Sequence, residues 1–246
     1  MTGSLDPALD DGTLLDGRVR HGQRQYGHRT GIEPVILAAC VPARRGNRVL
    51  EAGTGSGAAL LCLAARVPDL RGIGIERDPD LAAIARENLR ANGMQGYAIV
   101  TEDITAFRSD ERYDHAFANP PWHEPAGTPS PDTAREAAKR DTGDLLAAWA
   151  GALARPLRER GTLTFIVAAA VLPACLAGMT SAGCGGFKIA PLWPREGAAA
   201  KLVVVRSRRG GRSPCEILPG LVLHTANGGF TDAAEAILRH GQVLML

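Results

Sequence analysis

The stretch Val49-Leu50-Glu51-Ala52-Gly53-Thr54-Gly55-Ser56-Gly57 decides the fold. Apolar residues lead through Glu51 into a turn with glycine at every second position, and the Ala- and Leu-rich segment 58–67 that follows has the composition of a helix. A strand, a glycine turn and a helix in this order begin a βαβ unit. From residue 47 onward we therefore expect an α/β fold on a mostly parallel sheet.

The rest of the chain continues the alternation of strands and helices. Apolar runs predict strands at 72–76, 97–100, 113–118, 162–167, 187–192 and 202–206, and helical spacing predicts helices at 34–41, 81–92, 145–157, 171–179 and 233–239. The expected fold is a Rossmann-like, seven-stranded, mostly parallel sheet with helices on both faces. Residues 1–45 are expected to form an N-terminal extension that acts as a lid, and residues 46–246 a single domain with a helical tail.

Composition excludes several classes of protein. The 246 residues are 45% hydrophobic and 22% charged, with 28 basic and 26 acidic groups, which argues against disorder and against binding nucleic acid by overall charge. No secretion signal and no apolar run long enough to span a membrane is present. Five scattered cysteines without metal-ligand spacing predict reduced thiols, no metal site and a cytoplasmic protein.

Acidic residues end the second and third strands of the predicted sheet. In such sheets, ligands bind outside the carboxyl ends of the strands. Glu76 stands about 20 residues beyond the glycine turn, where a carboxylate binds ribose hydroxyls, and Asp103 is placed to accept from an exocyclic amine. The pattern predicts a nucleoside ligand; Gly53, Gly55 and Ala58 also fit a dinucleotide fingerprint loosely. A simple tight turn is the alternative.

The most specific motif is Asn119-Pro120-Pro121-Trp122, at the end of the fourth strand. Proline lacks a backbone donor and fixes φ, so the Asn119 side-chain oxygen and the Pro120 carbonyl can both accept hydrogens from one planar NH₂ group. Trp122 offers a flat face for stacking. The motif indicates transfer to a planar nitrogen, and the alternative is a proline turn beside a core tryptophan.

At these residues the chain resembles the class I S-adenosylmethionine-dependent methyltransferases with an Asn-Pro-Pro-aromatic motif. More narrowly, it is similar to the bacterial tRNA(Val) adenine-N6-methyltransferase family. The narrower resemblance rests on residues 25–31 with Glu33 and residues 36–39, and on the tail residues 221–224 and 228–231. Glu33, Glu51 and Trp122 depart from the residues that the family usually has, which leaves the identity of the substrate open.

The resemblance implies S-adenosylmethionine as cofactor and an exocyclic amine of a nucleobase, foremost adenine N6 in tRNA, as acceptor. Target-base residues would be Asn119, Pro120, Pro121 and Trp122. Cofactor-binding residues would be Glu51, Gly53, Thr54, Gly55, Gly57, Glu76, Asp103 and Arg29, with Glu76 at the ribose, Asp103 at the adenine and Arg29 near the cofactor carboxylate.

Two basic clusters offer phosphate contacts if they flank the catalytic face. The first comprises Arg18, Arg20, His21, Arg24, His28 and Arg29, and the second Arg206, Arg208, Arg209 and Arg212. RNA recognition would rest on them and on the loops 123–131 and 195–201. An ordinary solvated surface is the alternative, and the oligomeric state stays open.

Other functions share parts of the pattern. A glutamine side-chain amide in a peptide release factor and the N2 amine of guanine in ribosomal RNA are acceptors of the same chemistry. A non-catalytic nucleoside- or RNA-binding protein would not need Glu76, Asp103 and Asn119 together. An oxidoreductase leaves the segment 119–122 unexplained.

Overall fold

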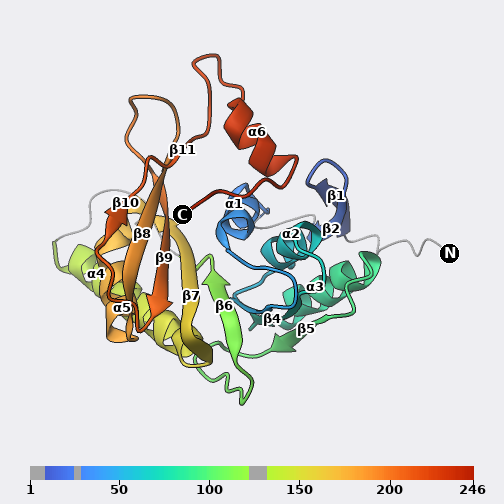
Figure 1. Ribbon diagram of the computed structural model, residues 1–246, viewed down its shortest axis with the longest axis horizontal. Coiled ribbons are helices and arrows are strands. Elements are labelled where there is room, and N and C mark those ends of the chain that lie inside the picture. The colour runs from blue at the N-terminus through green and yellow to red at the C-terminus, as the bar shows by residue number, and fades with distance from the viewer. Residues whose placement is uncertain (1–8, 25–28, 122–131) are drawn as a thin grey trace.

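The computed structural model describes residues 9–24, 29–121 and 132–246. Its long strands are β3 (Arg48–Ala52), β4 (Arg71–Glu76), β5 (Tyr97–Thr101), β6 (Tyr113–Ala118), β7 (Leu157–Ala168), β8 (Cys184–Trp193) and β9 (Leu202–Arg209). With short β10 (Glu216–Ile217) and β11 (Leu221–Val222), they form a nine-stranded sheet in the order β10-β8-β9-β7-β6-β3-β4-β5, where β11 pairs with β8 (Figure 1).

The strand directions confirm the predicted mostly parallel sheet. The neighbours β7, β6, β3, β4 and β5 pair in parallel, whereas β9 runs antiparallel to both β7 and β8. The chain moves outward from β3 to β5 and then returns to β6 on the other side of β3. This reversal lies between β3 and β6, which is where open α/β sheets bind their ligands.

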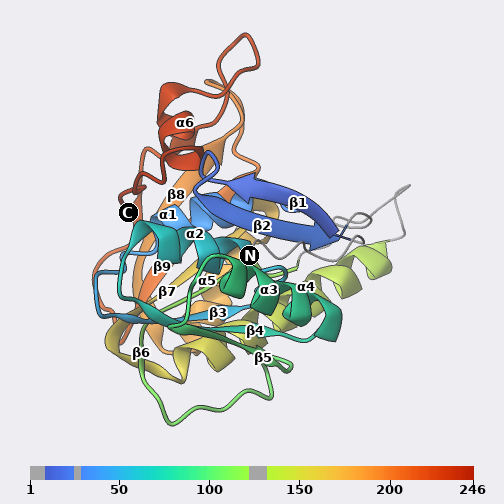
Figure 2. The ribbon, with the colours of Figure 1, turned by 90° about the vertical axis from the view of Figure 1, so that its right-hand side faces the viewer.

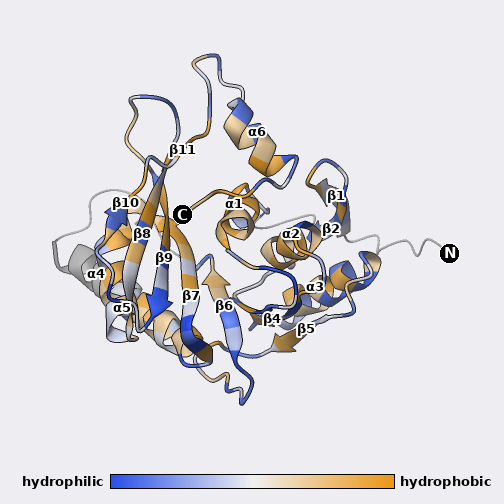
Figure 3. Ribbon diagram, viewed as in Figure 1, coloured by the Kyte–Doolittle hydropathy of each residue, from blue (hydrophilic) through white to orange (hydrophobic). Residues whose placement is uncertain are grey.

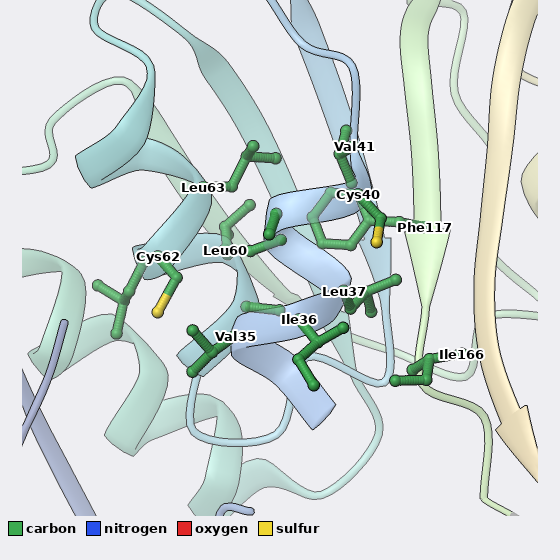
Figure 4. Close-up of a cluster of buried hydrophobic side chains, with 14 of the residues drawn as sticks. Val35, Ile36, Leu37, Cys40, Val41, Leu60, Cys62, Leu63, Phe117 and Ile166 are labelled. Atoms are coloured by element: carbon green, nitrogen blue, oxygen red, sulfur yellow. The ribbon is translucent and has the colours of Figure 1, made fainter. Parts of the chain in front are cut away.

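Helices cover both faces of the sheet, as predicted. α1 (Glu33–Cys40), α2 (Ala58–Arg66) and α3 (Pro79–Ala91) pack on one face, and α4 (Asp132–Ala154) and α5 (Leu172–Ser181) pack on the other. Alternating strand residues supply the two cores, so Val49 joins the first and Leu50 the second. Figure 4 shows Ile36 of α1 and Leu60 of α2 in the first core, near Phe117 of β6.

Two predicted boundaries were wrong where α4 meets β7. The helix predicted to reach Leu157 ends at Ala154, and the strand predicted from Thr162 already begins at Leu157. Pro156 cannot continue the helical hydrogen-bond pattern. This first part of β7 is exposed, so its charged residues 158–160 do not show the apolar pattern by which a strand is recognised.

The N-terminal part contains an antiparallel hairpin that the sequence reading did not predict. β1 (Leu9–Leu14) pairs with β2 (Val19–Arg24), and Figure 2 shows the hairpin lying over α2 and α3.

The C-terminal α6 (Asp232–Leu238) packs on α1, and the side chain of Thr231 caps its first turn. Within the described residues, no helix is both long and apolar enough to cross a membrane.

Candidate active site

The carboxyl ends of β3, β4 and β6 bring three predicted site residues into one row. In register, Ala52 lies between Ala118 of β6 and Ile75 of β4. The next residues along these strands are Gly53, Asn119 and Glu76. We name this side of the sheet the carboxyl edge, and the opposite side, where β3 and β6 begin, the amino edge.

The glycine turn at this edge has a left-handed backbone that favours glycine. Gly53, Gly55 and Gly57 have φ values of 63°, 56° and 90°. A Cβ added to Gly55 would find no atom within 4 Å, so the turn is open to a ligand there. A Cβ on Gly53 would lie 2.7 Å from the indole of Trp149 in α4. Sequence reasoning missed Trp149, because one aromatic residue in an Ala-rich helix is typical of a core position.

Glu51, two residues before Gly53, stabilises this turn through a hydrogen bond with Thr54. It is buried, and its Oε2 accepts a 2.5 Å hydrogen bond from the Thr54 hydroxyl. Burial raises the pKa of Glu51 to about 8, against the opposing effect of hydrogen bonds from Thr54 and the Leu60 backbone. The carboxyl group is therefore mostly protonated at neutral pH and stabilises the start of α2. Its contact with a bound cofactor stays a prediction, as does that of Thr54.

Glu76 joins the glycine turn to the next helix. Its Oε2 accepts from the Gly55 N–H at 2.8 Å and its Oε1 from the Asp78 N–H at 2.9 Å. Asp78 in turn caps the first turn of α3. A carboxylate offers about four acceptor positions, so further positions remain for hydroxyl donors. Glu76 thus combines a structural role with the capacity that the ribose prediction needs.

Asp103 follows β5 at the same edge and is exposed. Its Oδ1 accepts from the Thr105 hydroxyl at 2.5 Å and the Thr105 N–H at 2.8 Å, and these bonds lower the pKa of its carboxyl group. The group is therefore ionised at neutral pH. In the described part of the chain its Oδ2 has no hydrogen bond, so one charged oxygen remains for an amine donor.

Asn119 is half-buried at the end of β6, between buried Ala118 and buried Pro120. Within the described residues its amide makes no hydrogen bond, while Pro121 is exposed. A half-buried amide with no internal partner has its full bonding capacity left for a ligand. Trp122 lies outside the described residues, as do Gln25 to His28 of the N-terminal motif.

The first basic cluster is partly committed to ion pairs. Arg24 binds the carboxylates of Asp78 at 3.0 Å and Asp80 at 3.2 Å, which brings the hairpin close to the carboxyl edge. Arg29 pairs with Asp10 at 2.5 Å, so contact with a cofactor carboxylate would replace this pair. His21 is buried and unavailable to phosphate, whereas Arg18 and Arg20 are exposed.

The hypothesis that the second basic cluster flanks the catalytic face was wrong. β9 runs antiparallel, so its final arginines lie toward the amino edge, at the lower, hydrophilic end of β9 in Figure 3. Arg208 pairs with Thr162, level with the start of β6. Arg206 is buried and donates to the carbonyl groups of Cys40 and Leu246. Arg209 donates to carbonyl groups at the end of α4.

The residues at the carboxyl edge fit a nucleoside cofactor. An open glycine turn lies beside Glu76, which retains acceptor capacity for ribose, and Asp103 keeps a free oxygen for an adenine amine. Among the described residues, no group of three or more His, Cys, Asp or Glu side chains is arranged to hold a metal ion. The carboxylate oxygens of Glu76 and Asp103 are hydrogen-bond acceptors, which suits them to hydroxyl and amine groups of a ligand.

Comparisons with known proteins show which family this chain belongs to. Residues 32–146 match the family model of the methyltransferase small domain. The chain is 31% identical over 209 residues to the tRNA1(Val) (adenine(37)-N6)-methyltransferase of Aeromonas hydrophila, covering 83% of this chain and 86% of the relative. The enzyme of the same name from Actinobacillus succinogenes is 32% identical over 145 residues, or 57% of this chain and 61% of the relative.

Solved structures support the fold. The crystal structure of a predicted O-methyltransferase from Agrobacterium tumefaciens superposes with a TM-score of 0.72 and 22% identity, covering 87% of this chain and 99% of that one. The resemblance, fold class and cofactor predicted from the sequence are confirmed. The chain belongs to the tRNA1(Val) (adenine(37)-N6)-methyltransferase family and is an S-adenosylmethionine-dependent N-methyltransferase.

Proposed function

We propose that this enzyme acts in the cytoplasm and methylates the exocyclic N6 amine of an adenine in tRNA. The observation that carries the proposal is Asn119, a half-buried amide without an internal partner, next to the open glycine turn and followed by two prolines. The names of the relatives from Aeromonas hydrophila and Actinobacillus succinogenes support tRNA as the acceptor.

The residues proposed to bind the cofactor lie in and beside the row at the carboxyl edge. The backbone of the turn 53–57 would lie along the methionine part, Glu76 would accept from the ribose hydroxyls and Asp103 from the adenine amine. When bound, S-adenosylmethionine supplies an electrophilic methyl group on a sulfonium. Because Gly55 has no atom near its missing Cβ, its backbone can approach the ligand closely.

Asn119 and Pro120 would hold the acceptor by both hydrogens of its amine. The Asn119 side-chain oxygen accepts one hydrogen and the Pro120 carbonyl the other, which orients the nitrogen lone pair away from both acceptors. An adenine inside a helical stem would first have to leave the stack. Trp122 is proposed to stack on the extruded base. Positioning of this kind supplies a large part of a methyl-transfer rate.

The N-terminal extension is proposed to serve as a lid and part of the tRNA contact. Arg24 places β2 beside Asp78, which follows Glu76 by two residues. Arg18 and Arg20 are exposed on the same hairpin and can reach phosphate oxygens. The loop 195–201, which follows β8 at the carboxyl edge, is the proposed second contact.

Incubation with methyl-labelled S-adenosylmethionine and separate acceptors tests the proposal. Unmodified total tRNA, ribosomal RNA and a peptide release factor are digested after reaction and analysed by mass. We expect label in the tRNA sample alone. Label on a glutamine of the release factor or on guanine in ribosomal RNA would retain the amine chemistry and reject tRNA as the acceptor.

A further inference from the structure

Two asparagines, Asn88 of α3 and Asn92 directly after its end, bind the backbone of β2 as a neighbouring strand would. The Asn88 side chain accepts from the Gly22 N–H and donates to the Gly22 carbonyl, both at 2.8 Å. Asn92 makes the same pair of bonds to Arg20, at 2.9 and 2.7 Å. Four residues of helix advance ~6 Å and two residues of strand ~6.6 Å, so the two spacings match. The hairpin is thus fixed in register on α3.

Between these two contacts, His21 faces the glycine turn. Its Nε2 lies 2.8 Å from the hydroxyl of Ser56, and its side chain is almost completely buried. Asn88 also donates to the Ser56 carbonyl at 2.8 Å. Burial lowers the pKa of His21 to about 4, so the ring is neutral at physiological pH and one hydrogen bond links it to Ser56. Ser56 is therefore bound through both its side chain and its backbone.

We propose that His21 is a positioning residue for the cofactor: through Ser56 it holds the glycine turn in its binding conformation before the cofactor arrives. His21 belongs to the N-terminal hairpin and lies outside the set of residues predicted to contact the cofactor. The proposal concerns cofactor binding and holds whichever acceptor the enzyme uses.

The physical reason lies in the composition of the turn. Ser56 stands between Gly55 and Gly57, two residues with positive φ, and glycine loses more conformational freedom on ordering than any other residue. If the turn became ordered only when the ligand binds, this loss of entropy would make the free energy of binding less favourable. The bonds from His21 and Asn88 order the turn during folding instead, so the cofactor meets a prepared backbone.

Calorimetry with S-adenosylhomocysteine tests this role without any methyl transfer. We expect His21→Ala to weaken binding ~10-fold, as loss of a buried hydrogen bond does. His21→Gln, whose amide can reach the same hydroxyl, should bind within ~3-fold of the wild type. Ser56→Ala removes only a hydroxyl and should weaken binding as much as His21→Ala does. The double variant should bind S-adenosylhomocysteine no more weakly than the weaker-binding of the two single variants.

His115 supplies a matched control. Its ring bonds Thr162 at 2.8 Å and Asn47 at 3.1 Å at the amino edge, and burial also lowers its pKa to about 4. His115→Ala should lower the melting temperature and leave the affinity within ~2-fold, because it is remote from the turn. If folded His21→Ala and Ser56→Ala both bind as tightly as His115→Ala, the proposal is wrong.

Hydrogen exchange of the ligand-free protein gives a second readout. The Gly57 N–H donates to the Thr54 carbonyl at 2.8 Å and reports whether the turn is formed. In His21→Ala this amide should exchange ~10-fold faster, whereas in His115→Ala it should not. Equal exchange in both variants would assign His21 a general packing role and overturn the proposal.

Discussion

The two edges of the sheet carry polar residues of the same kinds but use them in opposite ways. At the carboxyl edge, Asn119 has no partner within the described residues and Asp103 keeps a free oxygen. At the amino edge, Asn47 accepts from both Arg44 and His115. Neighbouring residues satisfy the polar side chain at the amino edge, so the free hydrogen-bonding capacity at the carboxyl edge marks the site more clearly than residue type does.

The positions of the arginines also differ between the two edges, because they depend on strand direction. Arg24 lies near the carboxyl edge because β2 runs along α3 to Asp78, whereas Arg208 is the last residue but one of β9, an antiparallel strand whose end is far from Asn119. Extending the pairing of β6 with β7 by one residue places Asn119 level with Val204 of β9. Arg208 lies four residues beyond Val204, or roughly 13 Å along the strand. Chain proximity to a predicted strand therefore does not decide which edge a charge joins.

Removing the free amide should give the largest effect. Asn119→Ala is expected to reduce methyl transfer to tRNA at least ~100-fold, because a positioning contact is lost, and to leave S-adenosylhomocysteine affinity within ~2-fold. Asn47→Ala, the control at the amino edge, should lower only the melting temperature. Equal transfer rates in the two variants would remove the functional difference between the edges.

Glu76 carries the next largest effect. Glu76→Ala removes the acceptor of the Gly55 and Asp78 N–H groups as well as the proposed ribose acceptor, so S-adenosylhomocysteine should bind ~30-fold more weakly or worse. Exposed Glu111, which pairs with Arg48 near the amino edge, provides the control Glu111→Ala. Calorimetry of both variants checks this, and unchanged affinity in Glu76→Ala would contradict the ribose assignment.

The raised pKa of Glu51 predicts how stability depends on pH. The folded protein keeps this proton up to about pH 8, while the unfolded chain releases it near the usual value of 4.5. The stabilising contribution of Glu51 is therefore complete below pH 4.5 and is lost as the pH rises through about 8. Glu51→Gln should gain roughly 5 °C in melting temperature relative to the wild type between pH 5 and pH 9. A constant difference across this range would contradict the assignment.

The smallest effect concerns the basic clusters. Arg20→Ala removes an exposed charge of the hairpin proposed to contact tRNA, and should weaken tRNA binding roughly 3-fold and reduce the salt dependence by about one phosphate contact. Arg208→Ala removes an equal charge at the amino end of the sheet and should leave tRNA affinity unchanged. Filter binding at several salt concentrations checks both, and a reversed order would place the RNA beside β9 and not on the hairpin.

Most of the sheet was predictable because its elements have clear periods. The strand at 113–118 was predicted with its correct ends, and the helix over 58–67 differs by a single residue from α2. The hairpin was missed because its strands mix Asp, Gly and Arg with few apolar residues, although the Asp16-Gly17 pair is a turn signal. Its stability depends on Asn88, whose bonds to the hairpin no local pattern reveals.

Of the site, the sequence identified the motif residues and missed those that support them. Glycine spacing and strand ends predicted the row of Gly53, Glu76 and Asn119, since parallel strands end at a common edge. Trp149 and His21 reach the turn from distant elements, so only tertiary structure brings them there. The misplacement of Arg206 came from strand direction, which apolar runs do not specify.

The proposed site at the carboxyl edge presents a planar amine to the methyl group. Unmodified tRNA is incubated with S-adenosylmethionine carrying a deuterated methyl group, digested to nucleosides and analysed by tandem mass spectrometry. We expect the label on the base of adenosine, as N6-methyladenosine, in amounts equal to the S-adenosylhomocysteine formed. Label on a ribose 2′-oxygen would contradict it, because a hydroxyl group has no second hydrogen for the paired acceptors of Asn119 and Pro120.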